Sequence, residues 1–373
     1  MDVFARSTGL VTDEPHRRYL WTDAFAVCNY LGLYAATGEK RDLETAVGLV
    51  DRVHGVLGRH RPDDARTGWI SGLDEEEGAR HPTAGGLRIG KGTPERAADE
   101  PYDPHREWDR DGQYYHYLTR WMHALDRVAS VSGEPAYHDW AVELAKTTHA
   151  AFVYPADAGG GRRMVWKMSI GLSRPLVSTM GAHDPLDGLV TLSALAAVSP
   201  DGAPSLDREI AELADMCHNL RWVTDDPLGI GGLLVDTFRV AHLISAGRRM
   251  VTPGGVSAAK WFASLLEQAA DSLAAYLATG PLELPARARL PFRELGLAIG
   301  LAGMKRLAAT AGGERSTSLP ARLERLADQA DVADRIVHFW LDPSHRGATW
   351  TDHLDINRVM LATALVPDGY LGA

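Results

Sequence analysis

The chain has 373 residues, enough to bury a large core, and its 45% apolar and 24% charged residues are ordinary for a globular protein. A formal net charge of −10 argues against nucleic acid as a partner, because nucleic-acid binders present a basic face. No stretch approaches the run of about 18 apolar residues that spans a bilayer, and the first residues lack the pattern of a secretion signal. Cys28 and Cys217 fall within expected helices, as buried thiols do. We therefore expect a cytoplasmic protein with no membrane partner.

Helical hairpins repeat along the chain. Residues 31–57 and 124–152 show the same order of events: an apolar helix ends at a small residue plus Gly, Glu follows, and a one-sided helix begins. Gly38 and Gly133 suit the left-handed position that ends a helix. Weaker copies lie at 199–202, 252–255 and 311–314.

The first helix of each pair is apolar on nearly all sides, and the second on one side only, which predicts inner and outer helices. The expected inner helices are Leu20–Ala36, Tyr114–Val131, Leu186–Val198, Leu228–Ala246, Pro291–Leu307 and Thr351–Leu365. Outer stripes begin at Leu43, Tyr137, Ile210 and Leu323. The pattern predicts an all-α (α/α)6 toroid, an incomplete six-hairpin barrel of about 11–12 helices, as a single domain over residues 1–373. A linear helical solenoid is the alternative.

The connections between helices are lopsided, which favours the toroid over the solenoid. Links from inner to outer helix are short, whereas the links back, at 61–108 and 154–182, are long. Long loops gathered on one face of a scaffold usually carry function. The alternating stretch 162–170 predicts a small β-hairpin there.

Every expected inner helix carries an acid near its start, namely Asp23, Asp111, Asp187, Asp236, Glu294 and Asp355. Acids on otherwise apolar helices either face a shared polar cavity or have a partner. A ring of helices would gather them around one pocket. Each acid alone is also explained as a helix cap or an ion-pair partner, as for Asp236 with Arg239 and Asp355 with Arg358. Asp184, just before Pro185, is typical of a cap.

A pocket lined by carboxylates and aromatic rings suits sugars, since carboxylates accept hydroxyl hydrogen bonds and can share acid and base roles. The predicted catalytic acid or base is Asp111, partnered by Asp187 or Asp23. The predicted sugar contacts are Trp108, Asp109, Gln113, Tyr115, His116, Trp166, His183, Trp350, His353 and Asp355. The sequence has no Gly-rich phosphate loop, no Gly-x-Ser-x-Gly elbow and no zinc-spaced Cys/His set, so we expect no cofactor and no metal.

The Gly-Glu hairpins, with Trp and Asp on the inner helices, resemble the six-hairpin glycosidase superfamily over nearly the whole chain. Its cytoplasmic relatives include unsaturated glucuronyl hydrolases and N-acylglucosamine 2-epimerase-like isomerases. The resemblance implies an Asp at the start of an inner helix as general acid or base, which Asp111 matches best. For the epimerases it implies two histidines that move a proton, to which His116 and His353 compare, although their flanking residues match no motif.

Two other toroid families fit less well. Asp225-Asp226 is a poor copy of the aspartate-rich motif of terpene cyclases. Cys217 lies on an outer helix and Cys28 lacks the surroundings of a zinc ligand, which argues against a lanthionine cyclase.

The sequence thus predicts an enzyme acting on a small carbohydrate, with a glycoside hydrolase as the first hypothesis. A sugar epimerase or isomerase that uses inner-helix histidines is the second, and a non-catalytic sugar-binding toroid the third. An Asp111→Asn variant should inactivate the hydrolase, whereas His116→Ala should inactivate an epimerase that never cuts a glycosidic bond. The oligomeric state is not encoded in these patterns.

Overall fold

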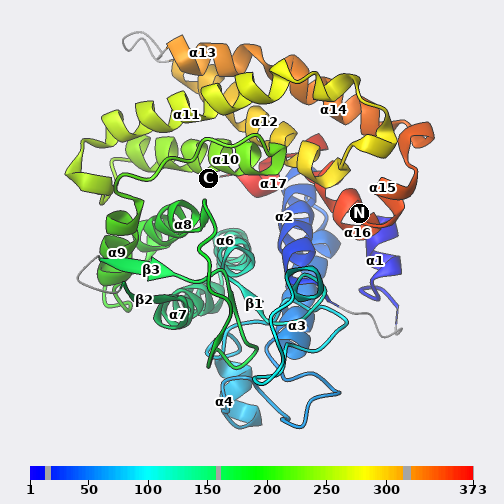
Figure 1. Cartoon of the computed structure of the whole chain (residues 1–373), viewed down its shortest axis with the longest axis vertical. Coiled ribbons are helices and arrows are strands. Elements are labelled where there is room, and N and C mark those ends of the chain that lie inside the picture. Colours follow the sequence, from blue (N-terminus) through cyan, green and yellow to red (C-terminus); the bar gives the residue numbers. More distant parts are fainter. Residues whose placement is uncertain (13–17, 157–160, 314–320, 373) are drawn as a thin grey trace. The chain divides into compact units, whose positions relative to one another are not determined.

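The computed structural model describes residues 1–12, 18–156, 161–313 and 321–372, which are mostly helical with a few short strands (Figure 1). The chain forms two compact units, Asp2–Met216 and Cys217–Ala373, here called the N-terminal and C-terminal units. The boundary falls at the end of helix α9 (Asp207–Cys217). A single domain over residues 1–373 stays a prediction.

The inner helices predicted from the sequence are confirmed. They are α2 (Leu20–Thr37), α6 (Tyr115–Ser132), α8 (Asp184–Val198), α10 (Pro227–Ser245), α12 (Pro291–Gly313) and α16 (Leu354–Leu365). Their observed ends lie within about three residues of the predicted ends, except that α12 continues to Gly313. In α2 every residue from Leu20 to Gly32 is buried, as expected of a helix that is apolar all round. The last inner helix starts later than predicted, because α15 (Ala348–Thr351) is a separate turn.

In the N-terminal unit each inner helix is followed by an outer one: α3 (Lys40–Leu57), α7 (Pro135–Phe152) and α9 (Asp207–Cys217). Gly38 and Gly133 lie in the left-handed region, with φ of 73° and 76°, and their N–H groups donate to the last turns of α2 and α6. These are the helix ends that the Gly-Glu pattern predicted. Helix α6 packs against α2, α7 and α8 (Figure 1).

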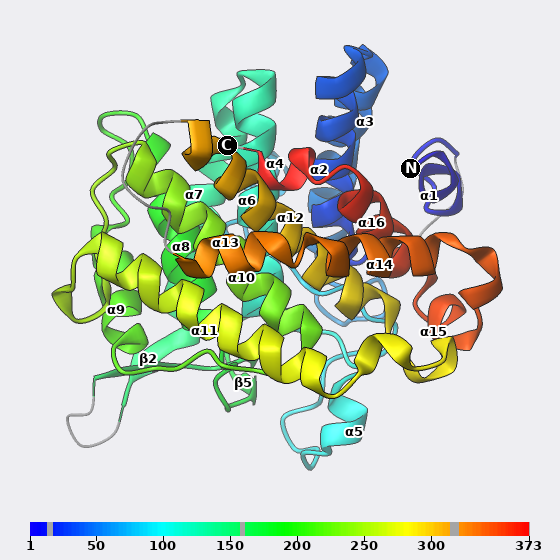
Figure 2. The same cartoon turned by 90° about the horizontal axis from the view of Figure 1, so that it is seen from above.

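In the C-terminal unit α12 packs against α10 and α16, and α11 (Ala258–Ala278) covers α10 (Figure 2). The sequence analysis did not single out α11, although Trp261, Leu265, Ala269 and Leu273 form its buried stripe. The stripe that begins at Leu323 is divided at Gln329 into α13 (Ala321–Asp328) and α14 (Ala330–Leu341). Other short elements are α1 (Asp2–Ser7), α17 (Asp368–Leu371), and the 3₁₀ turns η2 (Pro253–Gly255), η3 (Pro281–Glu283), η4 (Ala286–Ala288) and η5 (Pro343–His345).

Helix α10 corrects one sequence expectation. Its 19 residues are long and apolar enough to cross a membrane by length and composition, with a mean hydropathy of 1.3. The prediction that no stretch qualifies was therefore too strict. In the protein 56% of that window is buried, and the helix packs between α11 and α12. A buried core helix of a globular protein can also have the length and apolar composition of a membrane-spanning helix.

The strands lie in the N-terminal unit, with β1 between the link at 61–108 and α6, and β2 to β5 at or within the link at 154–182. β1 (Gln113–Tyr114), β4 (Lys167–Met168) and β5 (Pro175–Val177) form an antiparallel sheet in the order β1-β4-β5. β2 (Val153–Pro155) and β3 (Arg162–Met164) form a hairpin. The hairpin predicted within 162–170 is therefore paired differently: its first half pairs with β2, and its second half with β1 and β5. Alternation shows that a stretch is extended but not which strand it pairs with.

The link at 61–108 contains two short helices, α4 (Glu75–Arg80) and α5 (Pro104–Glu107). The Asp74 carboxylate accepts a hydrogen bond from the Glu77 N–H and caps α4. The link then enters β1 and α6, so its end and the link at 154–182 are joined through the β1–β4 pairing.

Candidate functional site

Six aromatic or imidazole side chains gather at the start of α6. This aromatic cluster consists of Tyr19, Trp108, Tyr114, His116, Tyr117 and Trp166, all from the N-terminal unit. The His116 ring stacks on Tyr114 with centroids 5.6 Å apart and on Trp166 at 6.3 Å. Trp108 meets Trp166 edge-on at 5.1 Å and is 52% exposed. The cluster is therefore open to a ligand on the Trp108 side, and its rings suit the apolar faces of a sugar.

His116 faces an acid on the neighbouring inner helix. Its Nδ1 lies 3.9 Å from Oδ1 of Asp184, the first residue of α8. The Trp166 indole N–H donates to the same Nδ1 at 3.3 Å. A neutral imidazole that accepts at Nδ1 carries its proton on Nε2, so its lone pair is on Nδ1, where the indole N–H of Trp166 occupies it. The ring can take up a proton at the atom that faces Asp184 once the indole hydrogen bond is released.

The surroundings move the pKa values of these two groups in opposite directions. Burial, followed by the positive charge of Arg120, lowers the pKa of His116 to about 4. Burial, followed by the negative charge of Asp187, raises the pKa of Asp184 to about 7. Oδ2 of Asp184 is buried and has no hydrogen-bond partner. A carboxyl group that holds its proton up to about pH 7, beside an imidazole that stays neutral down to about pH 4, is an arrangement that suits acid–base catalysis.

Asp187, a predicted catalytic residue, has a different environment from Asp184. Its carboxylate accepts from Arg120 at 2.5 Å and also from the Thr119 hydroxyl, and only 3% of the residue is exposed. These contacts tie α8 to α6. The Arg120–Asp187 ion pair also provides the two charges that act on His116 and Asp184, so Asp187 influences the pKa values of both groups.

Asp111, the first predicted catalytic residue, is completely buried. One oxygen accepts from Arg88 at 3.0 Å and from Arg61 at 3.3 Å, and the other accepts from the N–H groups of Gly90, Lys91 and Gly112. Every group that reaches it comes from the link at 61–108 or from the next residue along the chain. The geometry favours an anchor that fixes this link to the start of α6, and not an acid that meets a substrate.

We expect Asp111→Asn to lower the free energy of unfolding by about 3 kcal/mol, because it leaves the buried guanidinium of Arg88 without its counter-charge, whereas Arg61 keeps Asp63. Urea unfolding followed by circular dichroism measures this. Asp109→Asn removes a neighbouring but exposed acid and is the matched control, with an expected change below about 0.5 kcal/mol. An Asp111→Asn protein with wild-type stability and no activity would restore the catalytic role predicted from the sequence.

The other inner-helix acids are mostly held by arginine. Asp23 is buried, accepts from the N–H of Tyr19 at 3.2 Å and lies 3.7 Å from the guanidinium of Arg18. Glu294 accepts from Arg289 at 2.8 and 2.6 Å and from the Trp340 indole. Asp355 forms the ion pair with Arg358 that the sequence suggested, at 3.4 Å.

The predicted sugar contacts are divided between the two units. Trp108, His116 and Trp166 come together in the aromatic cluster, and Asp109 is exposed beside Trp108 in the chain. His183 is half-buried before α8. Two predicted contacts are fully enclosed: Gln113 bonds the backbone of Gly85, Leu87 and Ile170, and Tyr115 packs on Phe152. The remaining three, Trp350, His353 and Asp355, belong to the C-terminal unit, where Trp350 is buried under Arg346 and His353 is exposed against Phe292.

The sequence analysis missed Asp184, Tyr19 and Tyr117. It took Asp184 for a cap, yet Asp184 is the first residue of α8, and His183 at the cap position makes no side-chain capping bond. A signal was present, since His183-Asp184-Pro185-Leu186-Asp187 opens an inner helix with two acids three residues apart. Tyr19 and Tyr117 are ordinary aromatic residues in the sequence, and only the packing of α2 on α6 brings them together.

A Ser–His–Asp constellation lies elsewhere in the N-terminal unit. His138 is 2.9 Å from both Asp126 and Ser199. The Ser199 hydroxyl, however, donates to the Leu195 carbonyl at 3.0 Å, which engages the proton that a nucleophilic serine must give to histidine. These contacts join the ends of α6, α7 and α8. Within the described ranges, no group of three or more His, Cys, Asp or Glu side chains is arranged to hold a metal ion.

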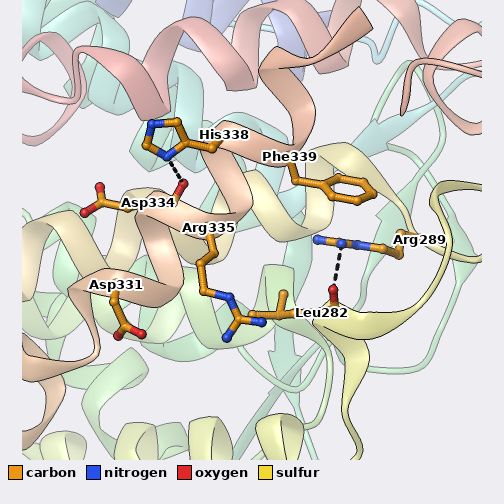
Figure 3. A pocket seen from close by; sticks show the side chains of 7 residues that line it. All are labelled: Leu282, Arg289, Asp331, Asp334, Arg335, His338 and Phe339. Atoms are coloured by element: carbon orange, nitrogen blue, oxygen red, sulfur yellow. Dashed lines mark hydrogen bonds between the residues drawn. The ribbon is translucent and has the colours of Figure 1, made fainter. Parts of the chain in front are cut away.

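The C-terminal unit has a surface cavity of about 570 Å³ along α14 (Figure 3). It is lined by Leu282, Arg289, Asp331, Asp334, Arg335, His338 and Phe339. The guanidinium of Arg289 stacks on Phe339 at 3.8 Å and donates to Glu294 and to the Leu282 carbonyl, so its donors are already engaged. Arg335 bonds Glu283. Both arginines of the lining are therefore already engaged.

No protein-family model and no curated protein sequence matches this chain. Two solved structures match nearly all of it. A sugar epimerase from a ruminal bacterium is 10% identical, over 93% of this chain and 87% of that one, with a TM-score of 0.51. The cellobiose 2-epimerase from Spirochaeta thermophila DSM 6192 is 13% identical, over 95% and 87%, also with a TM-score of 0.51. The chain has the fold of these epimerases.

This result confirms the predicted all-α (α/α)6 toroid, and it confirms the resemblance to the six-hairpin superfamily at the level of fold. The linear solenoid is set aside. At 10–13% identity an epimerase-like toroid establishes architecture, and the reaction has to be argued from the site itself.

Proposed function

We propose that this chain is a sugar epimerase or isomerase that removes a proton from the carbon next to the sugar's carbonyl group. His116 is the base, and Asp184 is its acid partner. The observation that carries the proposal is the His116–Asp184 pair at the aromatic cluster, where the imidazole and the carboxyl group lie 3.9 Å apart and their pKa values are shifted in opposite directions. The shared fold with two structures described as sugar epimerases supports it.

The chemistry follows from the protonation states. The Trp166 indole releases Nδ1 of His116, Nδ1 accepts the proton from C2 of an open-chain sugar, and the C–H electron pair forms the double bond of an enediol. Asp184 donates a proton to the carbonyl oxygen as negative charge develops there. Delivery of a proton from a water molecule to the opposite face of C2 gives the epimer, with the O1 proton returned to Asp184 and the proton on His116 passed to solvent. Delivery of the His116 proton to C1 gives the ketose, with the O2 proton taken up by the Asp184 carboxylate. Trp108, Trp166 and Tyr114 would cover the apolar faces of the sugar.

This proposal replaces the glycoside hydrolase as first hypothesis. The acids assigned to hydrolysis, Asp111, Asp187 and Asp23, are all held by arginine side chains in the structure. A hydrolase remains the second candidate because of Asp184, whose raised pKa suits an acid that protonates a glycosidic oxygen. Both the epimerase and the hydrolase would act on a small carbohydrate substrate. A cytoplasmic location stays a prediction.

Proton exchange with heavy water tests the proposal. The wild-type protein is incubated in D₂O with aldoses, among them glucose, mannose, N-acetylglucosamine and cellobiose, and followed by ¹H NMR. We expect the C2–H signal of at least one sugar to disappear while a C2 epimer or a ketose appears, with no monosaccharide released from cellobiose. Release of glucose from cellobiose without deuterium at C2 would favour the hydrolase. If the sugars bind but none exchanges or is cut, the non-catalytic sugar-binding toroid is favoured instead.

A further inference from the structure

The hydroxyl groups of Tyr19 and Tyr117 form one hydrogen bond, with an O–O distance of 2.5 Å. Tyr19 lies directly before α2, Tyr117 is in the first turn of α6, and their rings meet edge-on at 5.5 Å. The bond is partly buried, and both residues keep some exposure. This hydroxyl pair is not used by the His116–Asp184 chemistry described above.

A count of protons shows that the pair has one donor left over. Burial raises the pKa of Tyr19 to about 12 and holds the pKa of Tyr117 well above its usual value, so both phenols are protonated at neutral pH. Two O–H groups share one hydrogen bond. Neither hydroxyl has a second acceptor among the residues that the structure describes, so one O–H is available to a ligand.

That donor belongs to the same cluster as the proposed base. The Tyr117 ring lies perpendicular to His116 with centroids 4.7 Å apart, and it also contacts Tyr114 at 5.2 Å. A hydroxyl that itself receives a hydrogen bond is a stronger donor, because the two bonds polarise each other. A donor aimed at a developing oxyanion in a partly dry site stabilises the transition state more than the ground state.

We propose that the Tyr19–Tyr117 hydroxyl pair donates a hydrogen bond to the sugar oxygen on which negative charge develops as His116 removes the neighbouring proton. This inference rests on the proposed function. The C–H bond breaks, its electron pair becomes the carbon–carbon double bond, and the carbonyl π pair moves to oxygen. The oxygen then has two donors, the carboxyl group of Asp184 and the hydroxyl pair. The phenol keeps its proton, so no further reactant is needed.

Three variants test the pair: Tyr19→Phe, Tyr117→Phe and the double variant, each of which keeps the ring contacts. We expect the double variant to lose about 10²-fold or more in kcat, with KM changed by less than about 3-fold, since the lost bond strengthens only in the transition state. Deuterium exchange at C2 should fall by the same factor as turnover. One single variant, at the terminal donor, should lose nearly as much as the double. Tyr34→Phe, at the far end of α2, is the matched control.

The outcomes separate this inference from the proposed function. If the wild type exchanges deuterium at C2 and all three variants keep kcat within about 3-fold, the pair only ties α2 to α6 and the inference is overturned. A kcat loss that matches a loss of folded protein, measured by thermal unfolding, overturns it too. If the wild type exchanges no sugar proton, the proposed function itself has failed. Should the double variant not fold, the two single variants decide by the same criteria.

Discussion

We expect His116→Gln to lower C2 deuterium exchange by about 10²–10⁴-fold, the usual contribution of a general base. The substitution removes the group that takes the proton but costs the fold little. The His116 side chain is 30% exposed, and a glutamine oxygen can still accept the hydrogen bond of the Trp166 indole. The measurement is ¹H NMR in D₂O with the sugar that the wild type turns over, together with a thermal unfolding curve of the variant.

The acid side of the wild-type pH profile provides an independent check on His116. Because burial and Arg120 lower the pKa of His116 to about 4, the ring is neutral, and active as a base, above that pH. The wild-type kcat/KM should therefore fall only below about pH 4, which is lower than for an ordinary histidine. His81→Gln, at an exposed histidine paired with Glu143, is the control and should keep full activity. Exchange by His116→Gln within about 3-fold of wild type would remove His116 from the mechanism.

The helices could be predicted from the sequence because the buried face of a helix repeats apolar residues with the period of the helix. Helices α2 and α8 are apolar on all sides and α3 on one side, and Gly38 and Gly133 mark two hairpin ends. These signals depend only on residues close together in the sequence, so they can be recognised without knowing which helices pack together. Strand pairing is not local, which is why the stretch 162–170 was recognised as extended but given the wrong partners.

The site was harder to predict, because its chemistry depends on which acid lacks a counter-charge. Asp111 has many polar neighbours in the sequence, and that is also what a structural anchor needs; the arginines that hold it, Arg61 and Arg88, come from distant parts of a loop. Asp184 looked like a cap, and its raised pKa arises from burial and from the nearby charge of Asp187. His116 could be named from the sequence, but its acid partner could not.

Asp184→Asn should stabilise the protein at pH 8 relative to its effect at pH 4. The pKa of this carboxyl group rises from 3.8 to about 7 on folding, so the folded state holds the proton more tightly than the unfolded chain. The resulting stability is fully present below about pH 4 and is lost as pH rises through 7, by at most about 4 kcal/mol. Asparagine cannot ionise, so the variant does not lose stability in this way as pH rises. Any cost of placing its amide in the site is the same at both pH values and cancels in the comparison.

Urea unfolding of wild type and Asp184→Asn at pH 4 and pH 8 measures the effect, with Asp139→Asn on the exposed side of α7 as the control for losing one negative charge. His116 changes stability in the opposite direction between about pH 4 and 6.5, because its pKa falls on folding, but it is present in both proteins. An Asn-minus-wild-type difference that stays flat with pH would show that Asp184 is ionised in the fold.

Asp184→Asn also tests whether Asp184 acts as the acid, through the alkaline limb of the pH profile of kcat/KM. Wild-type kcat/KM should decline above about pH 7, where Asp184 loses its proton and can no longer donate to the developing oxyanion. In Asp184→Asn that limb should disappear, and activity at the optimum should drop by about 10²-fold or more, because an amide donates a hydrogen bond but no proton. If the variant instead keeps the wild-type rate and the limb near pH 7, another group titrates there. His116 would then need a different acid partner.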